Sequence, residues 1–309
     1  MRVEVSHESP ISLLRHSRSY NDYDYALVHL FEAYPEYFDF FVESLSEGRK
    51  VYLDNSIFEL KKSFDPARYV EWIGKLQPTY YIVPDVLEDA DGTVRQMMEW
   101  FDDTCGDSSV KKTCGTIGVV QGRDWDDLTR CYKVVEQLVD VVAISFDYDY
   151  YLLTGDGTGE TGTSWGEVVY GDAVPSVDDT ADPMECGVCI DKLNRYKTGR
   201  QRFISQLINE GIWNWKKPHH LLGCSLASEF GYYTDNNIYN IVTIDTSNPI
   251  VAGLKGYRYN DTRGLRGKPR TLLADMIDFR VSEDELPRYL NDIEYNTKMF
   301  KKIIGRHDG

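Results

Sequence analysis

The sequence predicts an α/β protein built on a TIM (β/α)8 barrel, with a long acidic, glycine-rich insertion after its fifth strand. Short apolar runs recur along the chain and alternate with segments of helical periodicity, which is typical of βαβ units and a parallel sheet. The runs are almost continuously apolar, as expected for strands buried on both faces. A doubly wound open sheet is the alternative, but no G-x-G-x-x-G follows the first strands, which disfavours its dinucleotide-binding form.

Seven apolar runs are predicted as strands, at residues 26–31, 50–55, 79–85, 116–121, 139–146, 219–225 and 239–246, with an eighth near 250–254. Residues 67–76 follow Pro66, which suits the first turn of a helix. Residues 124–138 open with acidic side chains and continue with apolar residues at helical spacing. The 309 residues are therefore interpreted as one catalytic barrel domain, residues 1–309.

Composition excludes several classes of protein. Hydrophobic residues make up 42% of the chain and aromatic residues 13%, which suffices for a core and excludes global disorder. No apolar run reaches about 18 residues, so no membrane span is expected. Residues 1–7 lack the apolar core of a signal peptide, and six cysteines in a chain of this length fit a reduced, cytoplasmic protein.

The net charge of −16 argues at first against a nucleic-acid partner, because phosphate binding needs clustered Lys and Arg. The charge is unevenly spread, however, since eleven acidic residues and no Lys or Arg lie in residues 147–191. That stretch is interpreted as an inserted loop or small subdomain. Residues 253–270 have the opposite sign, and their basic residues are Lys255, Arg258, Arg263, Arg266, Lys268 and Arg270. A solvated face and a loop that binds a nucleic-acid backbone are equally good interpretations of this basic segment.

Catalytic groups of a TIM barrel lie at the C-terminal ends of its strands. The predicted strands end at Asp54, Asp85, Gln121, Ser145 with Asp147, Cys224 and Asp245. A single carboxylate there is most simply a cap of the next helix or turn. Three carboxylates on one face repel one another, however, which favours chemistry that uses them, such as cleavage of a glycosidic bond or metal binding.

Metal and cofactor signals are weak. No H-x-H or H-E-x-x-H occurs, which disfavours a hydrolytic zinc site. Cys186 and Cys189 form a C-x-x-C, and a zinc ion bound there would need two further ligands. His219 and His220 are candidates for these ligands, but the sequence does not support a full ligand set for a structural zinc. Two reduced thiols are the preferred interpretation, and no cofactor or metal is expected.

Six segments resemble, in the same order, motifs of the tRNA-guanine transglycosylase family. They are VYLDNSIFE at 51–59, VPD at 83–85, GVVQG at 118–122, AISF at 143–146, HLLGC at 220–224 and VTIDTSNP at 242–249. The first is similar to the family's Asp-Ser-Gly-Gly motif, the third to Gly-Ile-Val-Gln-Gly-Gly, and the last to the strand that carries the nucleophilic aspartate. The resemblance covers about residues 50–255 and implies a base-exchanging pentosyltransferase.

The departures from the family pattern are informative. The Gly-Gly pair after the first aspartate is replaced by Ser56-Ile57, and a glycine-rich motif is replaced by the acidic insertion. The three cysteines and distant histidine of the structural zinc site have no counterpart after Asp245. In these respects the chain is similar to the phage and bacterial branch called DpdA, which is understood to exchange guanine in DNA for a 7-deazaguanine base. DNA and a free 7-deazaguanine, 7-cyano-7-deazaguanine above all, are then the expected partners, in the cytoplasm of the host cell if the protein is phage-encoded.

The resemblance also implies residue roles. Asp245 is the nucleophile at the anomeric carbon, and Asp54 is the acid that then acts as base. The side chains of Asp85 and Gln121 hold the Watson–Crick edge of the base. Further substrate contacts are expected from Gly122, from the backbone around Ser145 and Phe146, and from Phe58 or Tyr257 as an aromatic lid. The basic segment 253–270 is placed to hold phosphates beside a flipped-out or single-stranded base.

Three other functions remain open at this level. The same chemistry on tRNA would use the same residues. A barrel glycoside hydrolase would pair Asp245 with Asp54 or Asp85, although the basic segment disfavours it. An inactive nucleic-acid-binding barrel is the third, and the oligomeric state is also open, a homodimer included.

Overall fold

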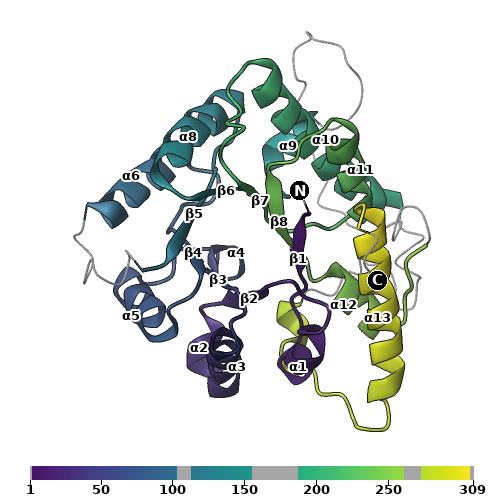
Figure 1. Ribbon diagram of the computed structural model, residues 1–309. Helices are drawn as coiled ribbons and strands as arrows, with labels where there is room; N and C mark the ends of the chain where they lie inside the picture. Colours follow the sequence, from purple (N-terminus) through teal and green to yellow (C-terminus); the bar gives the residue numbers. More distant parts are fainter. Residues whose placement is uncertain (1, 103–112, 155–186, 261–272, 307–309) are drawn as a thin grey trace.

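The computed structural model describes residues 2–102, 113–154, 187–260 and 273–306 (Figure 1). Most of the acidic insertion lies outside these residues, and so do Arg263, Arg266, Lys268 and Arg270 of the basic segment. Among the described residues, no helix combines the length and the apolar composition that crossing a membrane requires.

The described residues form a TIM-like barrel of eight parallel strands, so the predicted fold class is confirmed. The strands are β1 Glu4–Ser6, β2 Asp24–Leu27, β3 Val51–Asp54, β4 Tyr80–Ile82, β5 Gly115–Val119, β6 Val141–Ile144, β7 His219–Leu221 and β8 Ile241–Asp245. Hydrogen-bonded neighbours run in the order β1-β8-β7-β6-β5-β4-β3-β2, and Figure 1 shows the strands as a ring inside the helices. The gap between β1 and β2 is bridged where the Asp22 N–H donates to the Val5 carbonyl at 2.9 Å and the Asp22 carboxylate accepts from the Val5 N–H at 2.9 Å.

Helices cover the outside of the barrel. They are α1 Leu14–Ser17, α2 Leu30–Ala33, α3 Pro35–Ser46, α4 Ile57–Leu60, α5 Pro66–Leu76, α6 Ala90–Phe101, α8 Trp125–Leu138, α9 Asp149–Thr154, α10 Gly187–Asn209, α11 Phe230–Asp235, α12 Asn248–Leu254 and α13 Leu286–Ile303. Three 3-10 turns complete the set at Ile11–Leu13, Ala227–Glu229 and Ala274–Met276. Asp65 and Asp124 cap α5 and α8 by accepting backbone N–H groups, which explains why both predicted helices begin where the sequence indicates.

Three details of the prediction are corrected. The first strand is β1, which has three residues and therefore too little alternation to stand out. The insertion consequently follows the sixth strand of the barrel, which is the fifth of those recognised in the sequence. Residues 250–254 belong to α12 and not to a strand, because a helix that is buried on all sides has the same continuous apolar run as a buried strand.

The two ends of the inserted segment are helical rather than irregular. Helix α9 opens it, and α10 begins at Gly187, within the range 147–191. The two helices approach closely at Gly199, where a Cβ atom would lie 2.5 Å from the Tyr151 Cα. Glycine is therefore required at this crossing, and the insertion is anchored to the barrel by packed helices on both sides.

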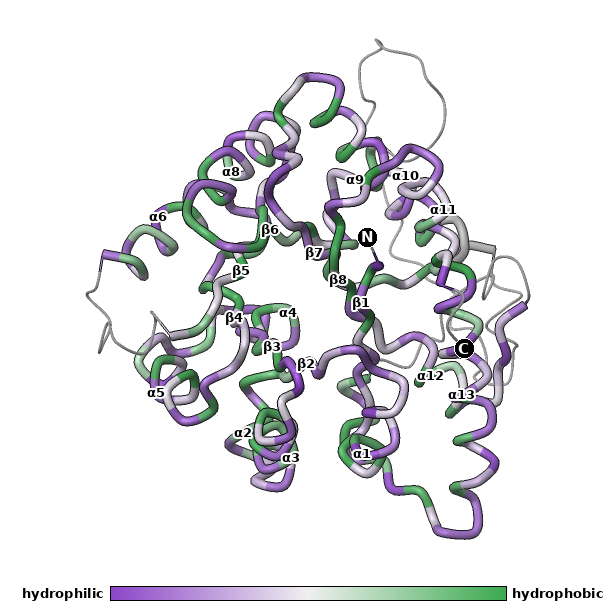
Figure 2. The backbone as a smooth tube through the Cα atoms, viewed as in Figure 1, coloured by the Kyte–Doolittle hydropathy of each residue, from purple (hydrophilic) through white to green (hydrophobic). Residues whose placement is uncertain are grey.

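Apolar residues form the core of the molecule, and in Figure 2 the hydrophobic colour runs along strands such as β6 and β8. The barrel interior is unusually rich in tyrosine. The Tyr52 ring lies 4.4 Å from that of Tyr23 and 5.0 Å from that of Tyr80. Because the interior is packed, chemistry is confined to the mouth at the C-terminal ends of the strands.

Candidate active site

Four carboxyl groups, here called the carboxyl cluster, meet at this mouth: Glu8, Asp54, Glu59 and Asp245. The strand register explains the convergence. Asp245 ends β8 and pairs with Ser6 of β1, so that Glu8, two residues further on, lies beside it. Asp54 ends β3 opposite Leu27 of β2, and Glu59 follows on α4. Burial, and with it the charges of neighbouring members of the cluster, raises the pKa values of Glu8, Asp54 and Glu59.

The Asp245 carboxylate is held from the side of β7. The Gly223 N–H lies 3.2 Å from one carboxylate oxygen and 3.3 Å from the other. Gly223 has a φ of +64°, a left-handed conformation that favours glycine. His220 approaches from the same strand, with Nε2 at 3.1 Å from Oδ1 but outside hydrogen-bonding geometry. Asp245 is only 5% exposed, so these donors are close in a largely dry environment.

The Asp54 carboxylate is held from two other sides. The Tyr25 hydroxyl donates to Oδ2 at 2.5 Å, and the Ser56 N–H donates to Oδ1 at 2.5 Å. Burial raises the pKa of Asp54 to about 6, against the lowering effect of these two hydrogen bonds. A group with that pKa can both give and take a proton near neutral pH.

Ser56 adopts a left-handed conformation, with φ of 59° and ψ of 25°. Such a conformation costs a non-glycine residue about 1–2 kcal/mol, and it turns the N–H of Ser56 toward Asp54. This backbone strain lies next to a candidate catalytic group.

We expect Ser56→Gly to be neutral or stabilising by up to about 1 kcal/mol, because it relieves this strain. Ser56→Val should destabilise the protein by about 1–3 kcal/mol, since a β-branched residue tolerates positive φ poorly. Urea unfolding of both variants measures the difference. Equal stability of the two variants would contradict the argument.

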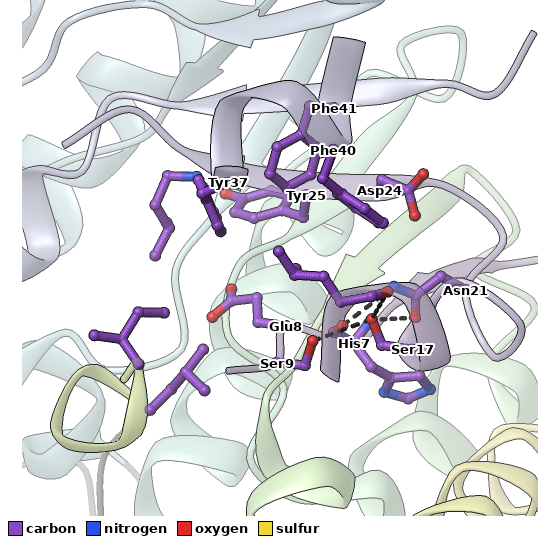
Figure 3. Close-up of a pocket in the computed structure, with 14 residues that line it drawn as sticks. His7, Glu8, Ser9, Ser17, Asn21, Asp24, Tyr25, Tyr37, Phe40 and Phe41 are labelled. Atoms are coloured by element: carbon purple, nitrogen blue, oxygen red, sulfur yellow. Dashed lines mark hydrogen bonds between the residues drawn. The ribbon is translucent and has the colours of Figure 1, made fainter. Parts of the chain in front are cut away.

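Glu8 and Glu59 are members of the cluster that the sequence did not reveal. Burial, and after it the charges of the other three members, raises the pKa of Glu8 well above its usual range, and a hydrogen bond with Asp245 acts in the same direction. Burial, followed by the charge of Asp54, raises the pKa of Glu59 to about 7. Figure 3 shows Glu8 in a small pocket with Tyr25 and Tyr37, with room for about one water molecule.

These raised pKa values predict an unusual dependence of stability on pH. A carboxyl group whose pKa is higher in the folded state binds its proton more tightly there, so stability falls as pH rises from the ordinary value of 4.5. We therefore expect Glu8→Gln to stabilise the protein at pH 8, on the order of 1 kcal/mol after screening by solvent. Urea unfolding at pH 8 and pH 3 measures this gain, which should vanish at pH 3, because Glu8 is then protonated in both the folded and the unfolded state. A Glu8→Gln variant that is less stable at pH 8 would contradict the assignment.

Asp85 and Gln121 come together, but they bind each other. The Gln121 Nε2 donates to one carboxylate oxygen of Asp85 at 2.6 Å, and the Asn55 Nδ2 donates to the other at 2.7 Å. The remaining Gln121 oxygen accepts the N–H of Glu88 at 2.9 Å. Asp85 is fully buried, and burial raises its pKa to about 6 although both hydrogen bonds lower it. A base can use these two side chains only by displacing the bond between them.

The other predicted substrate contacts have structural partners. A Cβ on Gly122 would lie 2.7 Å from the Leu128 nitrogen, so glycine is needed for the start of α8 to pack. The Ser145 hydroxyl donates to Asp147 at 3.1 Å. The Phe146 ring is buried against Tyr196, with the centroids 5.7 Å apart. Phe146 therefore packs the outer layer, whereas half-buried Ser145 remains near the mouth.

The predicted lid and phosphate contacts lie on the surface. Phe58 is 47% exposed, and the Lys61 Nζ lies 3.9 Å from the centre of its ring. Tyr257 is half-buried against the core. Lys255 is exposed, whereas the Arg258 Nε pairs with Asp292 at 2.7 Å.

The two histidines considered as zinc ligands are engaged in the barrel. His219 Nε2 lies 2.9 Å from the Tyr132 hydroxyl, its Nδ1 lies 3.1 Å from Asn240, and burial lowers its pKa to about 3. His220 faces the barrel interior. Within the described part of the chain, no three His, Cys, Asp or Glu side chains are arranged to hold a metal ion. Cys186 lies outside that part, and the side chain of Cys189 is not described.

Sequence reasoning missed Glu8, Glu59, Tyr25 and His220 as members of the site. The rule of strand ends would have found Glu8 if the short β1 had been recognised, but Glu59 lies on a helix and carries no such signal.

In comparisons with known proteins, the chain matches no protein-family model and no curated protein. Fold and site together define a TIM-like barrel with a carboxyl cluster at the C-terminal ends of its strands.

Proposed function

We propose that the protein is a transglycosylase that exchanges guanine in DNA for a 7-deazaguanine base, 7-cyano-7-deazaguanine above all. The observation that carries the proposal is the pairing of two different carboxyl groups at one mouth. Asp245 accepts hydrogen bonds from the Gly223 backbone, while Asp54 has a pKa of about 6. Pairs of acids in such contrasting environments are typical of glycosyl transfer, which needs one nucleophile and one proton carrier.

In the proposed reaction, an Asp245 oxygen attacks C1′ of the nucleotide, and the bond between C1′ and the guanine nitrogen breaks. Asp54 gives its proton to the leaving base and becomes a carboxylate. That carboxylate then takes the proton from the ring nitrogen of the incoming base. The nitrogen attacks C1′, the ester bond to Asp245 breaks, and both carboxyl groups return to their first states.

Base recognition is assigned to Asp85 and Gln121, as the family resemblance implies. In the free protein their hydrogen bond shields both groups from water. A guanine edge offers a carbonyl to the Gln121 amide and N–H donors to the Asp85 carboxylate, so it replaces the bond that it breaks. Bases without this donor and acceptor pattern leave a buried polar group unpaired, which costs about 1–3 kcal/mol.

The DNA assignment rests on the resemblance and on the basic segment, of which Lys255 is exposed in the described residues. Incubation with labelled guanine and either duplex DNA or tRNA tests it. Label in DNA supports the proposal. Label in tRNA alone would assign the activity to RNA. The absence of label from both nucleic acids would contradict base exchange.

A further inference from the structure

The Asp245 carboxylate has a buried neighbour to which no role has yet been given. His220 is fully buried on β7, and its Nε2 has no hydrogen-bond partner among the described residues, although it lies 3.1 Å from Asp245 Oδ1. An unpaired buried nitrogen is costly, so its retention at this position calls for an explanation. Apo enzymes often hold such catalytic contacts slightly out of line and tighten them when substrate binds.

The other ring nitrogen is fixed. His220 Nδ1 lies 2.9 Å from the hydroxyl of Thr243 on β8. Thr243 and Asp245 are two residues apart on one strand, so both point to the same face, and Thr243 is the residue paired with His220 in the sheet. The imidazole thus spans the hydroxyl and the carboxylate, and the Tyr25 ring stacks on it with the centroids 6.1 Å apart.

We propose that His220 is the positioning residue of Asp245: it is held by Thr243 and directs an Nε2–H at the carboxylate oxygen. This inference rests on the proposed function for its catalytic meaning. The Thr243 hydroxyl can either donate to Nδ1 or accept from it, so the state of Asp245 decides which tautomer of His220 is favoured. When Asp245 is ionised, the favourable tautomer carries its proton on Nε2, and the Thr243 hydroxyl donates to Nδ1.

The contact has a chemical consequence. In the described part of the chain, Asp245 faces three other carboxyl groups and, on the side of β7, the Gly223 N–H and His220. An Nε2–H on this side favours the ionised carboxylate and fixes the direction of the oxygen that attacks C1′. Loss of the donor therefore slows the chemical step more than it weakens substrate binding.

Matched variants test the catalytic part in the exchange assay. His220→Gln keeps a side-chain N–H, whereas His220→Leu removes it; Thr243→Ser keeps the hydroxyl, whereas Thr243→Val removes it. We expect His220→Leu to lower kcat about 100-fold with KM changed less than about threefold, and His220→Gln to stay within about tenfold of wild type. We expect Thr243→Val to lower kcat about tenfold, and Thr243→Ser, which keeps the hydroxyl, to recover most of that loss. A kcat of His220→Leu within threefold of wild type would overturn the proposal.

A second measurement does not depend on activity. The 15N NMR signals of the six histidines, with His220 assigned by its loss in His220→Gln, report which nitrogen carries the proton. We expect a proton on Nε2 in the wild type at pH 8, and a changed His220 signal in Asp245→Asn. A proton on Nδ1 alone, or a signal that Asp245→Asn leaves unchanged, overturns the inference. A wild-type protein that exchanges no base but shows the expected signals refutes the proposed function alone.

Discussion

Asp245→Asn is expected to lower base exchange at least about 10³-fold while the protein stays folded. An amide is a poor nucleophile and cannot form the glycosyl ester. Asparagine has nearly the same shape, and its side-chain oxygen can still accept the Gly223 N–H. Unfolding should therefore change little, or shift toward greater stability, because one charge leaves the carboxyl cluster.

The measurement is label incorporation into DNA, with circular dichroism and urea unfolding on the same preparation. Asp140→Asn is a matched control, because Asp140 lies at the opposite end of the barrel and bonds the Thr116 N–H at 2.8 Å. We expect that variant to keep wild-type activity. Exchange by Asp245→Asn at the wild-type rate would remove Asp245 as the nucleophile, whatever the stability result.

Arg200→Met is expected to destabilise the fold by about 3–5 kcal/mol, the usual effect of leaving a buried charge without its partner. Arg200 and Glu229 are both fully buried and form a two-pronged pair, with Nε and Nη2 each donating to a carboxylate oxygen at 2.8 Å. Burial alone lowers the pKa of Arg200, but the Glu229 charge and its hydrogen bonds raise it above the ordinary value.

The pair also ties strands to the helical layer. Arg200 Nη1 donates to the carbonyls of Ile144 at 3.2 Å and Leu222 at 2.9 Å, at the C-terminal ends of β6 and β7. The Tyr233 hydroxyl donates to Glu229 at 2.5 Å. Arg200→Met thus removes the guanidinium donors from two carbonyls and from the Glu229 carboxylate beside the candidate active site.

Urea unfolding followed by tryptophan fluorescence measures the loss. The double variant Arg200→Met with Glu229→Leu should recover much of it, since no buried charge remains. Arg130→Ala is the surface control: Arg130 is 51% exposed in its pairs with Asp91 and Asp127, so its loss should cost less than about 1 kcal/mol. A loss for Arg200→Met as small as that of Arg130→Ala would contradict a structural role for the buried pair.

Local sequence features predicted the barrel because most of its strands and helices have a recognisable residue pattern within a few positions. Asp124 caps α8, and the apolar run of β8 ends in Asp245. Where the local signal was too short or ambiguous, prediction failed. The three residues of β1 show no usable period, and α12 is buried on all sides, so its run of apolar residues resembles a strand.

The amino-acid sequence by itself determined the alternation of strands and helices and the placement of Asp54 and Asp245 at strand ends, whereas Asp85 lies three residues beyond the end of β4. Only the tertiary structure decided which groups surround each of them. Closure of the barrel brings Glu8, two residues after the first strand, beside Asp245 of the last strand, and it sets His220 against the same carboxylate. These contacts join residues more than twenty positions apart, and a pKa depends on burial and on charges across such contacts, which no local pattern encodes.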